Sequence, residues 1–271
     1  MERIKDAISK ARQSQTQSGL NKSLSPSRPR RPAPDVESEK IAYSETTVTE
    51  LDTKQLSSNR IITFDSEDPD SVAFDVLRTQ VLAKMDENGW NTLAITSPSP
   101  ECGKTVVALN LALSIAKQTD KTALAVDFDL KRPRIADYLG LKPKASLFDY
   151  LEHDLEVKDI LINPGFPRLV VLPNTVPVKN SAETLTSRRV KSLVHDLKSR
   201  YESRIVIYDL PPLMAGDDAI AFMPQVDCVL LVVASGETKP IEVKEARRQI
   251  QSTNLLGVVL NKSSERQTHY Y

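Results

Sequence analysis

The sequence has little cysteine, no net charge and no long hydrophobic run. Only Cys102 and Cys228 occur among 271 residues, which excludes a disulfide framework and a cysteine-based structural metal site and fits a reducing compartment. The chain has 36 lysines and arginines together and 36 aspartates and glutamates together, so no global electric field draws the protein to nucleic acid. We therefore expect no nucleic acid as a partner. The longest apolar run, Val229–Ala234, is far short of the about 20 residues that span a bilayer. We therefore expect a cytoplasmic protein that reaches a membrane only through a partner.

The first 58 residues differ in composition from the rest of the chain. Residues 1–14 carry a narrow apolar stripe at helical spacing, which predicts a short helix that either docks on a partner or frays. From about Gln13 to Asn59 the chain is rich in Ser, Pro, Thr and charge, and burial cannot offset its ordering entropy. This composition predicts a disordered arm, either a solvated spacer or a docking segment. We divide the chain into this helix and arm, residues 1–58, and one globular domain, residues 59–271.

Short apolar runs alternate with helical patterns from Arg60 onward. The predicted strands are RIITF, TLAITS, TALAVDF, RLVVLP, RIVIYDL, DCVLLVVA and LLGVVLN. The predicted helices cover about 72–86, 104–118, 187–200 and 239–252. This alternation is typical of an α/β fold in which helices cover a mainly parallel sheet. Ligands of such sheets bind beyond the carboxyl ends of strands, so the loops after TLAITS, TALAVDF and RIVIYDL should carry the chemistry.

The first of these loops reads SPSPECGKT and runs into an apolar helix, the context of a phosphate-binding loop. Backbone N–H groups at the helix start would bind phosphate oxygens, Lys104 would reach the terminal phosphates, and the Thr105 hydroxyl would ligate Mg²⁺. Pro98 replaces the first glycine of the G-x-x-x-x-G-K-[ST] pattern, so the context carries this prediction. A Gly-Lys-Thr at a helix start also arises by chance.

Acidic residues end the second and third of these strands. Asp127 and Asp129 lie on one face at the end of TALAVDF, where two carboxylates are costly unless a cation lies between them. Asp209 ends RIVIYDL, which suits an aspartate that holds Mg²⁺ or its waters. An isolated Asp-x-Asp more often caps the following turn or pairs with bases such as Lys131 and Arg132. Together, the three strand ends supply the groups for Mg²⁺-nucleotide chemistry and predict nucleotide binding.

The order of these motifs resembles that of the bacterial tyrosine kinases, a branch of the P-loop ATPases. ITSPSPECGKT is similar to their Walker A motif, ALAVDFDLKRPR to their second aspartate motif, called Walker A′, and IVIYDLPP to their Walker B motif. Ser99 stands where partition and septum-site ATPases usually carry an extra lysine. The resemblance covers residues 60–271 and implies a three-layer P-loop NTPase fold. It also implies an ATP-dependent protein-tyrosine autokinase that regulates exopolysaccharide (capsule) biosynthesis and export.

The resemblance implies ATP and Mg²⁺ as ligands and gives individual residues their roles. Lys104, Asp127, Asp129 and Asp209 are implied in catalysis, and Thr105 joins the three aspartates at the metal. The residues implied at the nucleotide are Pro100, Glu101, Cys102, Gly103, Lys104, Thr105, Val106 and Asn261. Asn261 ends the last strand, where an asparagine that starts a turn is an equally good account.

The resemblance further implies phosphate acceptors and partners. Tyr270 and Tyr271 correspond to the terminal tyrosine cluster that these kinases phosphorylate on a neighbouring subunit, although two terminal tyrosines also arise by chance. A transmembrane polysaccharide chain-length (co-polymerase) modulator is implied as partner, which would recruit the chain to the inner face of the membrane. A homo-oligomer is implied as well.

Two departures from the family pattern keep an alternative open. Glu101 stands where these kinases usually have glycine, which costs about 1–2 kcal/mol if the backbone must be left-handed. It also places a negative charge near the phosphates. In the predicted helix 72–86, Arg78 fits the subunit-contact pattern Glu-x-x-Arg-x-x-Arg, while Val72 and Asp75 replace the other two residues. An attenuated kinase, a regulatory ATPase switch of the partition or septum-site type, or a pseudokinase scaffold with weakened ATP binding is therefore the alternative.

Overall fold

A computed structural model of the chain describes residues 47–49, 51–65, 68–117, 120–201 and 203–263. Its strands are β1 (Thr47–Val48), β2 (Thr92–Thr96), β3 (Thr122–Asp127), β4 (Ile162–Asn163), β5 (Leu169–Leu172), β6 (Arg204–Asp209), β7 (Cys228–Ala234) and β8 (Asn254–Asn261). They form one sheet in the order β1-β4-β5-β3-β6-β2-β7-β8, in which only β4 and β5 pair antiparallel among these strands. The predicted α/β fold with a mainly parallel sheet is therefore confirmed.

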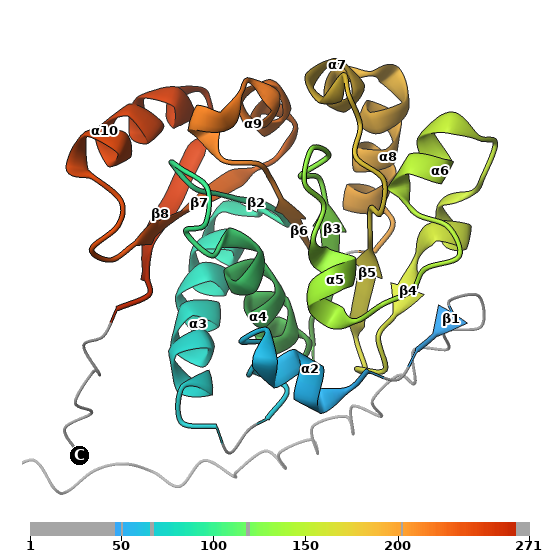
Figure 1. Cartoon of the computed structure of the whole chain (residues 1–271), viewed down its shortest axis with the longest axis horizontal. Coiled ribbons are helices and arrows are strands. Elements are labelled where there is room, and N and C mark those ends of the chain that lie inside the picture. The colour runs from blue at the N-terminus through green and yellow to red at the C-terminus, as the bar shows by residue number, and fades with distance from the viewer. Residues whose placement is uncertain (1–46, 50, 66–67, 118–119, 202, 264–271) are drawn as a thin grey trace, which may run out of the picture. The chain divides into compact units, whose positions relative to one another are not determined.

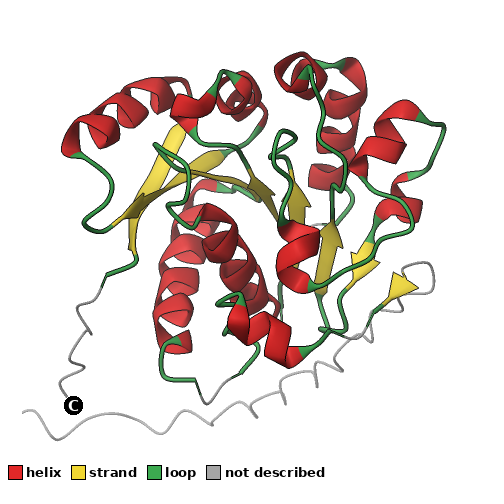
Figure 2. Ribbon diagram, in the orientation of Figure 1, coloured by secondary structure: helices red, strands yellow, loops and turns green. Residues whose placement is uncertain are grey.

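Helices cover both faces of this sheet (Figure 1; Figure 2). The α-helices are α2 (Thr53–Ser58), α3 (Ser71–Asn88), α4 (Lys104–Ala116), α5 (Ile135–Leu139), α6 (Leu147–Glu152), α7 (Ser181–Thr186), α8 (Arg188–Ser199), α9 (Asp218–Phe222) and α10 (Pro240–Gln249). Short 3-10 helices are η1 (Val157–Ile160), η2 (Leu213–Ala215), η3 (Met223–Gln225) and η4 (Ile250–Ser252). Figure 1 shows α3 and α4 on one side of the sheet and α8, α9 and α10 on the other, which gives three layers.

The alternation of side chains along each strand divides the core into two clusters. In β2, Leu93 and Ile95 join the cluster under α3 and α4, whereas Ala94 joins the cluster under α8 and α9. Every residue of β2, β3, β6 and β7 is buried. These strands are apolar on both faces because helices cover both, and this explains why their sequences read as continuous apolar runs.

Six of the seven predicted strands and all four predicted helices are present, but RIITF is not a strand. Arg60 has a φ of 59°, and the N–H groups of Ile62 and Thr63 donate to Asn110 Oδ1 at 2.8 and 3.1 Å. An amide of α4 thus satisfies backbone groups that a neighbouring strand would otherwise bind. Ile61 is still fully buried, so its hydrophobicity reflects packing on α4.

The end of the predicted arm is ordered, contrary to the expectation from composition. β1 pairs with β4, and α2 begins at an Asp52 side chain that accepts a hydrogen bond from the Lys54 N–H. Leu56 is fully buried, and the Asn59 side chain donates to the Tyr138 carbonyl at 2.9 Å. One buried leucine and these caps fix a segment that is otherwise polar. Residues 1–46, which include the predicted helix over 1–14, lie outside the described residues, and the boundary at residue 58 stays a prediction.

In the part of the chain that the structure covers, no helix is both long and apolar enough to cross a membrane.

Candidate functional site

The phosphate loop connects β2 to α4, as the sequence predicts. Gly103 precedes the first residue of α4 with φ 87° and ψ 25°, a left-handed conformation that glycine adopts without steric cost. Because Gly103 has no side chain, it leaves the N–H groups of the first helical turn uncapped. A helix start with uncapped N–H groups is a binding site for phosphate, since the helix dipole adds to the donor groups.

Lys104 and Thr105 point at the acids of the neighbouring strands. Lys104 Nζ lies 2.8 Å from Asp129 Oδ2 and 3.7 Å from Asp209 Oδ1. The Thr105 hydroxyl donates to Asp209 Oδ2 at 2.6 Å. Burial alone would lower the pKa of Lys104, but the charges of Asp209 and Asp129 outweigh it and raise the pKa. Lys104 is therefore a buried cation, held where the ends of β3 and β6 meet.

Asp127 lies opposite Asp209 in the register of β3 and β6, and both side chains are buried. Burial, and then the charge of Asp209, raises the pKa of Asp127 well above its usual value. Burial also raises the pKa of Asp209. Two carboxylates in this position repel each other when both are ionised, so the pair favours either a proton or a cation.

The alternative account of the Asp-x-Asp motif is correct in part. Asp127 Oδ2 accepts hydrogen bonds from the N–H groups of Arg134 at 2.9 Å and Ile135 at 2.8 Å, so it caps the start of α5. Asp129 Oδ1 accepts from the Arg132 N–H at 3.1 Å, while its Oδ2 binds Lys104 and not Lys131. Both acids therefore shape the loop after β3. The second oxygen of Asp129 binds Lys104, and the second oxygen of Asp127 accepts no hydrogen bond from a described residue.

The donor set fits Mg²⁺ in the form that nucleotide sites use. Asp127 Oδ1 and Asp209 Oδ1 are buried and accept no hydrogen bond from any described residue. No group of three or more His, Cys, Asp or Glu within the described ranges forms a preformed cage for a metal ion. Mg²⁺ usually binds one or two carboxylates and completes its shell with phosphate oxygens and water, so a full protein cage is not required. The four-residue metal site predicted from Thr105, Asp127, Asp129 and Asp209 stays a prediction.

Asn261 lies against the phosphate loop. Its side-chain Nδ2 donates to the Cys102 carbonyl at 2.9 Å, and a Cβ atom built on Gly103 would lie 2.3 Å from the same nitrogen. The Cys102 thiol is buried and lies 3.2 Å from the Ser99 carbonyl. Asn261 therefore supports the backbone of the loop, a role that its position at a strand end did not indicate. Its predicted contact with the nucleotide stays a prediction.

The remaining predicted residues occupy the surface of the loop or lie outside the structure. Pro100 and Glu101 are exposed, and Val106 is partly buried on the first turn of α4. Glu101 has a φ of 64°, the left-handed conformation anticipated for it, and its exposed side chain is not buried in the site. Tyr270 and Tyr271 lie outside the described residues.

We expect Glu101→Gly to stabilise the chain by about 0.5–1 kcal/mol, because glycine removes the strain at positive φ but adds freedom to the unfolded chain. The variant should also bind Mg²⁺-ATP more tightly, since it removes a negative charge beside the phosphates. Thermal unfolding with and without Mg²⁺-ATP measures both effects. Arg60→Gly is the matched control: Arg60 has a φ of 59° and is exposed outside the loop. It should share the gain in stability and leave the nucleotide-induced shift unchanged. Equal shifts in both variants would contradict the role of charge.

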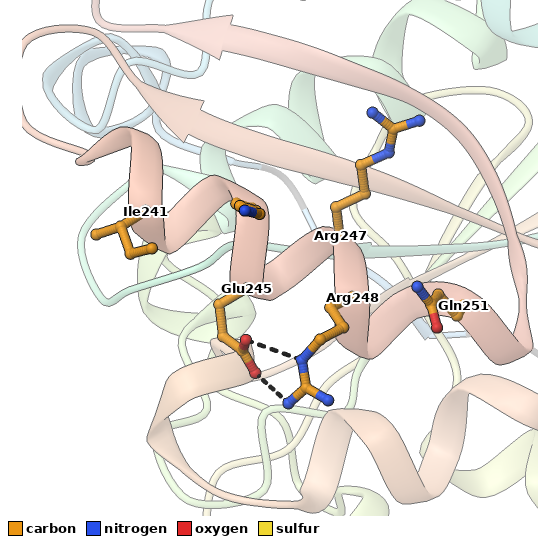
Figure 3. A pocket seen from close by; sticks show the side chains of 6 residues that line it. Ile241, Glu245, Arg247, Arg248 and Gln251 are labelled. Carbon is orange, nitrogen blue, oxygen red and sulfur yellow. Dashed lines mark hydrogen bonds and ion pairs between the residues drawn. The ribbon is translucent and has the colours of Figure 1, made fainter.

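A surface hollow over α10 and η4 is not part of this site. The side chains of Ile241, Lys244, Glu245, Arg247, Arg248 and Gln251, from α10 and η4, line it (Figure 3). Glu245 and Arg248 pair within it through bonds of 2.9 and 2.7 Å. None of its lining residues belongs to the phosphate loop or to the acidic ends of β3 and β6.

No protein-family model matches the chain. Tyrosine-protein kinase YwqD of Bacillus subtilis is 27% identical over 209 residues, which cover 76% of this chain and 87% of that protein. The solved kinase domain of the Escherichia coli tyrosine kinase ETK is 30% identical, with a TM-score of 0.68 over 76% of this chain and 81% of that one.

This chain belongs to the bacterial tyrosine kinase family. Some of the curated relatives are much longer proteins. The chain spans only 26–29% of the length of the first of them, which include tyrosine-protein kinase ptk of Acinetobacter johnsonii. The septum-site-determining protein MinD of Pyrococcus horikoshii, 22% identical with a TM-score of 0.54 over 65% of this chain and 72% of that one, shares the fold. The three-layer P-loop fold expected from the motifs is thus confirmed.

Proposed function

We propose that this bacterial tyrosine kinase transfers the γ-phosphoryl group of Mg²⁺-ATP to tyrosine hydroxyls, its own Tyr270 and Tyr271 included. The observation that carries the proposal is the convergence of Lys104, Thr105, Asp129 and Asp209 within bonding distance at the carboxyl ends of β2, β3 and β6. The order of the three motifs and the names of the relatives point to the same reaction.

Each side chain has a task that follows from its position. The first turn of α4 would bind the β- and γ-phosphate oxygens, and Lys104 would exchange Asp129 for the phosphates, whose charge it partly neutralises. Thr105 and Asp209 would hold Mg²⁺, which supplies charge stabilisation for the transferred group. The tyrosine oxygen forms the new bond to phosphorus, the bond to the β–γ bridging oxygen breaks, and the hydroxyl proton passes to Asp127 or Asp129.

The two acids are suited to this proton transfer for different reasons. Asp127 has a pKa raised by burial and by Asp209, which makes its ionised form a stronger base. Asp129 is released from Lys104 once the lysine turns to the phosphates. Catalysis of phosphoryl transfer depends mainly on positioning and charge neutralisation, which this set supplies.

The setting of the reaction also belongs to the proposal. One relative is named as a tyrosine kinase in the cps region of Klebsiella pneumoniae, and capsule or exopolysaccharide assembly is the process that the family resemblance implies. We propose a transmembrane chain-length modulator as partner, which would complete the active site and recruit the chain to the inner face of the membrane.

Incorporation of ³²P from labelled ATP tests the proposal directly. The intact chain, with its membrane partner present, should incorporate label on tyrosine, and Tyr270→Phe/Tyr271→Phe should remove most of it while leaving nucleotide binding intact. Mass spectrometry after incubation with Mg²⁺-ATP locates the phosphate. Release of inorganic phosphate without phosphotyrosine would replace the proposal by a regulatory ATPase switch. No thermal shift at millimolar Mg²⁺-ATP would instead indicate a pseudokinase scaffold.

A further inference from the structure

Lys131 and Asp218 form an ion pair between the loop after β3 and the start of α9. The two residues are 87 positions apart in the sequence. The Asp218 side chain is 2% exposed, whereas 41% of the Lys131 side chain is exposed. Burial alone would raise the pKa of Asp218, but hydrogen bonds, the one from Lys131 foremost, and the charge of Lys131 together outweigh it and lower the pKa. A buried carboxylate therefore depends on this lysine for its charge partner.

The backbone beneath the pair is shaped to admit it. A Cβ atom built on Gly216 would lie 2.9 Å from Lys131 Nζ and 3.0 Å from Asp218 Oδ2. A side chain at this position would require the Lys131 ammonium, the end of a flexible side chain, to shift. The pair thus lies against the backbone of Gly216, and its carboxylate is buried.

Each partner belongs to a segment that is bonded to the nucleotide site. Lys131 follows Asp129, which holds Lys104 and accepts the Arg132 N–H within the same turn. Asp218 ends a segment whose Leu213 N–H donates to the Ser97 carbonyl at 2.9 Å and whose Met214 N–H donates to the Pro98 carbonyl at 3.0 Å. The segment after β6 is therefore fixed to the phosphate loop, and Lys131 fixes the Asp129 loop to that segment.

We propose that the Lys131–Asp218 pair is a positioning link that sets the placement of Asp129 relative to the phosphate loop. Neither residue contacts the reacting atoms. The inference rests on the proposed kinase function, since Asp129 is one of the two groups proposed to accept the tyrosine proton. Proton transfer and metal placement depend on geometry at the level of 1 Å, so a loosened link should slow turnover more than it weakens ATP binding.

The test combines kinetics with hydrogen exchange of the full chain without nucleotide. Lys131→Met should speed amide exchange in residues 129–134 and 213–218, lower the turnover number about tenfold and change the KM for ATP less than threefold. Lys131→Arg keeps the charge and should restore both readouts to near wild type. Arg132→Met, an exposed neighbour on the same loop, is the matched control and should resemble wild type.

Asp218→Asn provides a second route to the same link, because it removes the charge without leaving a buried carboxylate unpaired. It should reproduce the faster exchange even if Lys131→Met folds poorly. Unchanged exchange and turnover in both variants would overturn the positioning link while wild-type phosphorylation still supports the kinase. Faster exchange in a chain that makes no phosphotyrosine would uphold the link between the loops and reject the kinase proposal.

Discussion

Lys104→Met should reduce formation of phosphotyrosine by at least about a hundredfold. Lys104 is the buried cation closest to the acids of β3 and β6, and no other described lysine forms an ion pair with Asp129 or Asp209. Without it the charge that develops on the transferred phosphoryl group loses its nearest protein partner, and loss of one such electrostatic contact typically costs 10²–10³ in rate. Incorporation of ³²P over time, at saturating Mg²⁺-ATP, measures the effect.

The same substitution changes stability, and the two effects can be separated. Methionine leaves Asp129 and Asp209 buried without their cation, which destabilises the chain until one acid takes up a proton. Lys104→Met/Asp129→Asn removes part of this repulsion and should recover stability without recovering phosphorylation. Lys121→Met, which removes an ion pair with the exposed Asp86 side chain, is the surface control and should leave the rate unchanged. Phosphorylation by Lys104→Met near the wild-type rate would remove the central element of the proposed mechanism.

The position of the site could be predicted from the sequence because topology alone determines it. Parallel strands end at one edge of their sheet, so the ends of β2, β3 and β6 had to meet once the order of motifs indicated parallel pairing. The strands themselves were readable because their apolar runs match burial on both faces. RIITF has the same composition, but Asn110 binds its backbone, and no local pattern reveals a partner that distant.

The contacts within the site could not be predicted in the same way. Asp129 has Lys131 and Arg132 beside it in sequence, yet its side chain binds the Lys104 ammonium at the start of α4. Lys131 instead pairs with Asp218. Asp127 caps α5, which has only five residues and is too short to show a periodic apolar pattern in the sequence. Several bases and acids lie within reach of one another at this sheet edge. Backbone geometry, and not residue type, selects the pairs among them.

Gly103→Ala should cost more stability than Gly89→Ala, because it adds a collision with Asn261 to a similar backbone strain. Both Gly103 and Gly89 have positive φ, 87° and 67°, so an alanine is strained at either position by about 1 kcal/mol. At Gly89 nothing lies within 4 Å of the new Cβ, whereas at Gly103 it would lie 2.3 Å from Asn261 Nδ2. To relieve this collision, Asn261 must give up its hydrogen bond to the Cys102 carbonyl.

A double-mutant cycle isolates that collision. In an Asn261→Ala background the amide is gone, so the cost of Gly103→Ala in the free energy of unfolding should fall to that of Gly89→Ala. Nucleotide affinity should stay low in the double variant, because a left-handed alanine still disfavours the loop that presents the N–H groups of α4 to phosphate. Denaturant unfolding and titration with Mg²⁺-ATP measure the two quantities independently. Equal costs at Gly103 and Gly89 in the wild-type background would mean that Asn261 does not support the phosphate loop, and its side chain would then be free to face the nucleotide.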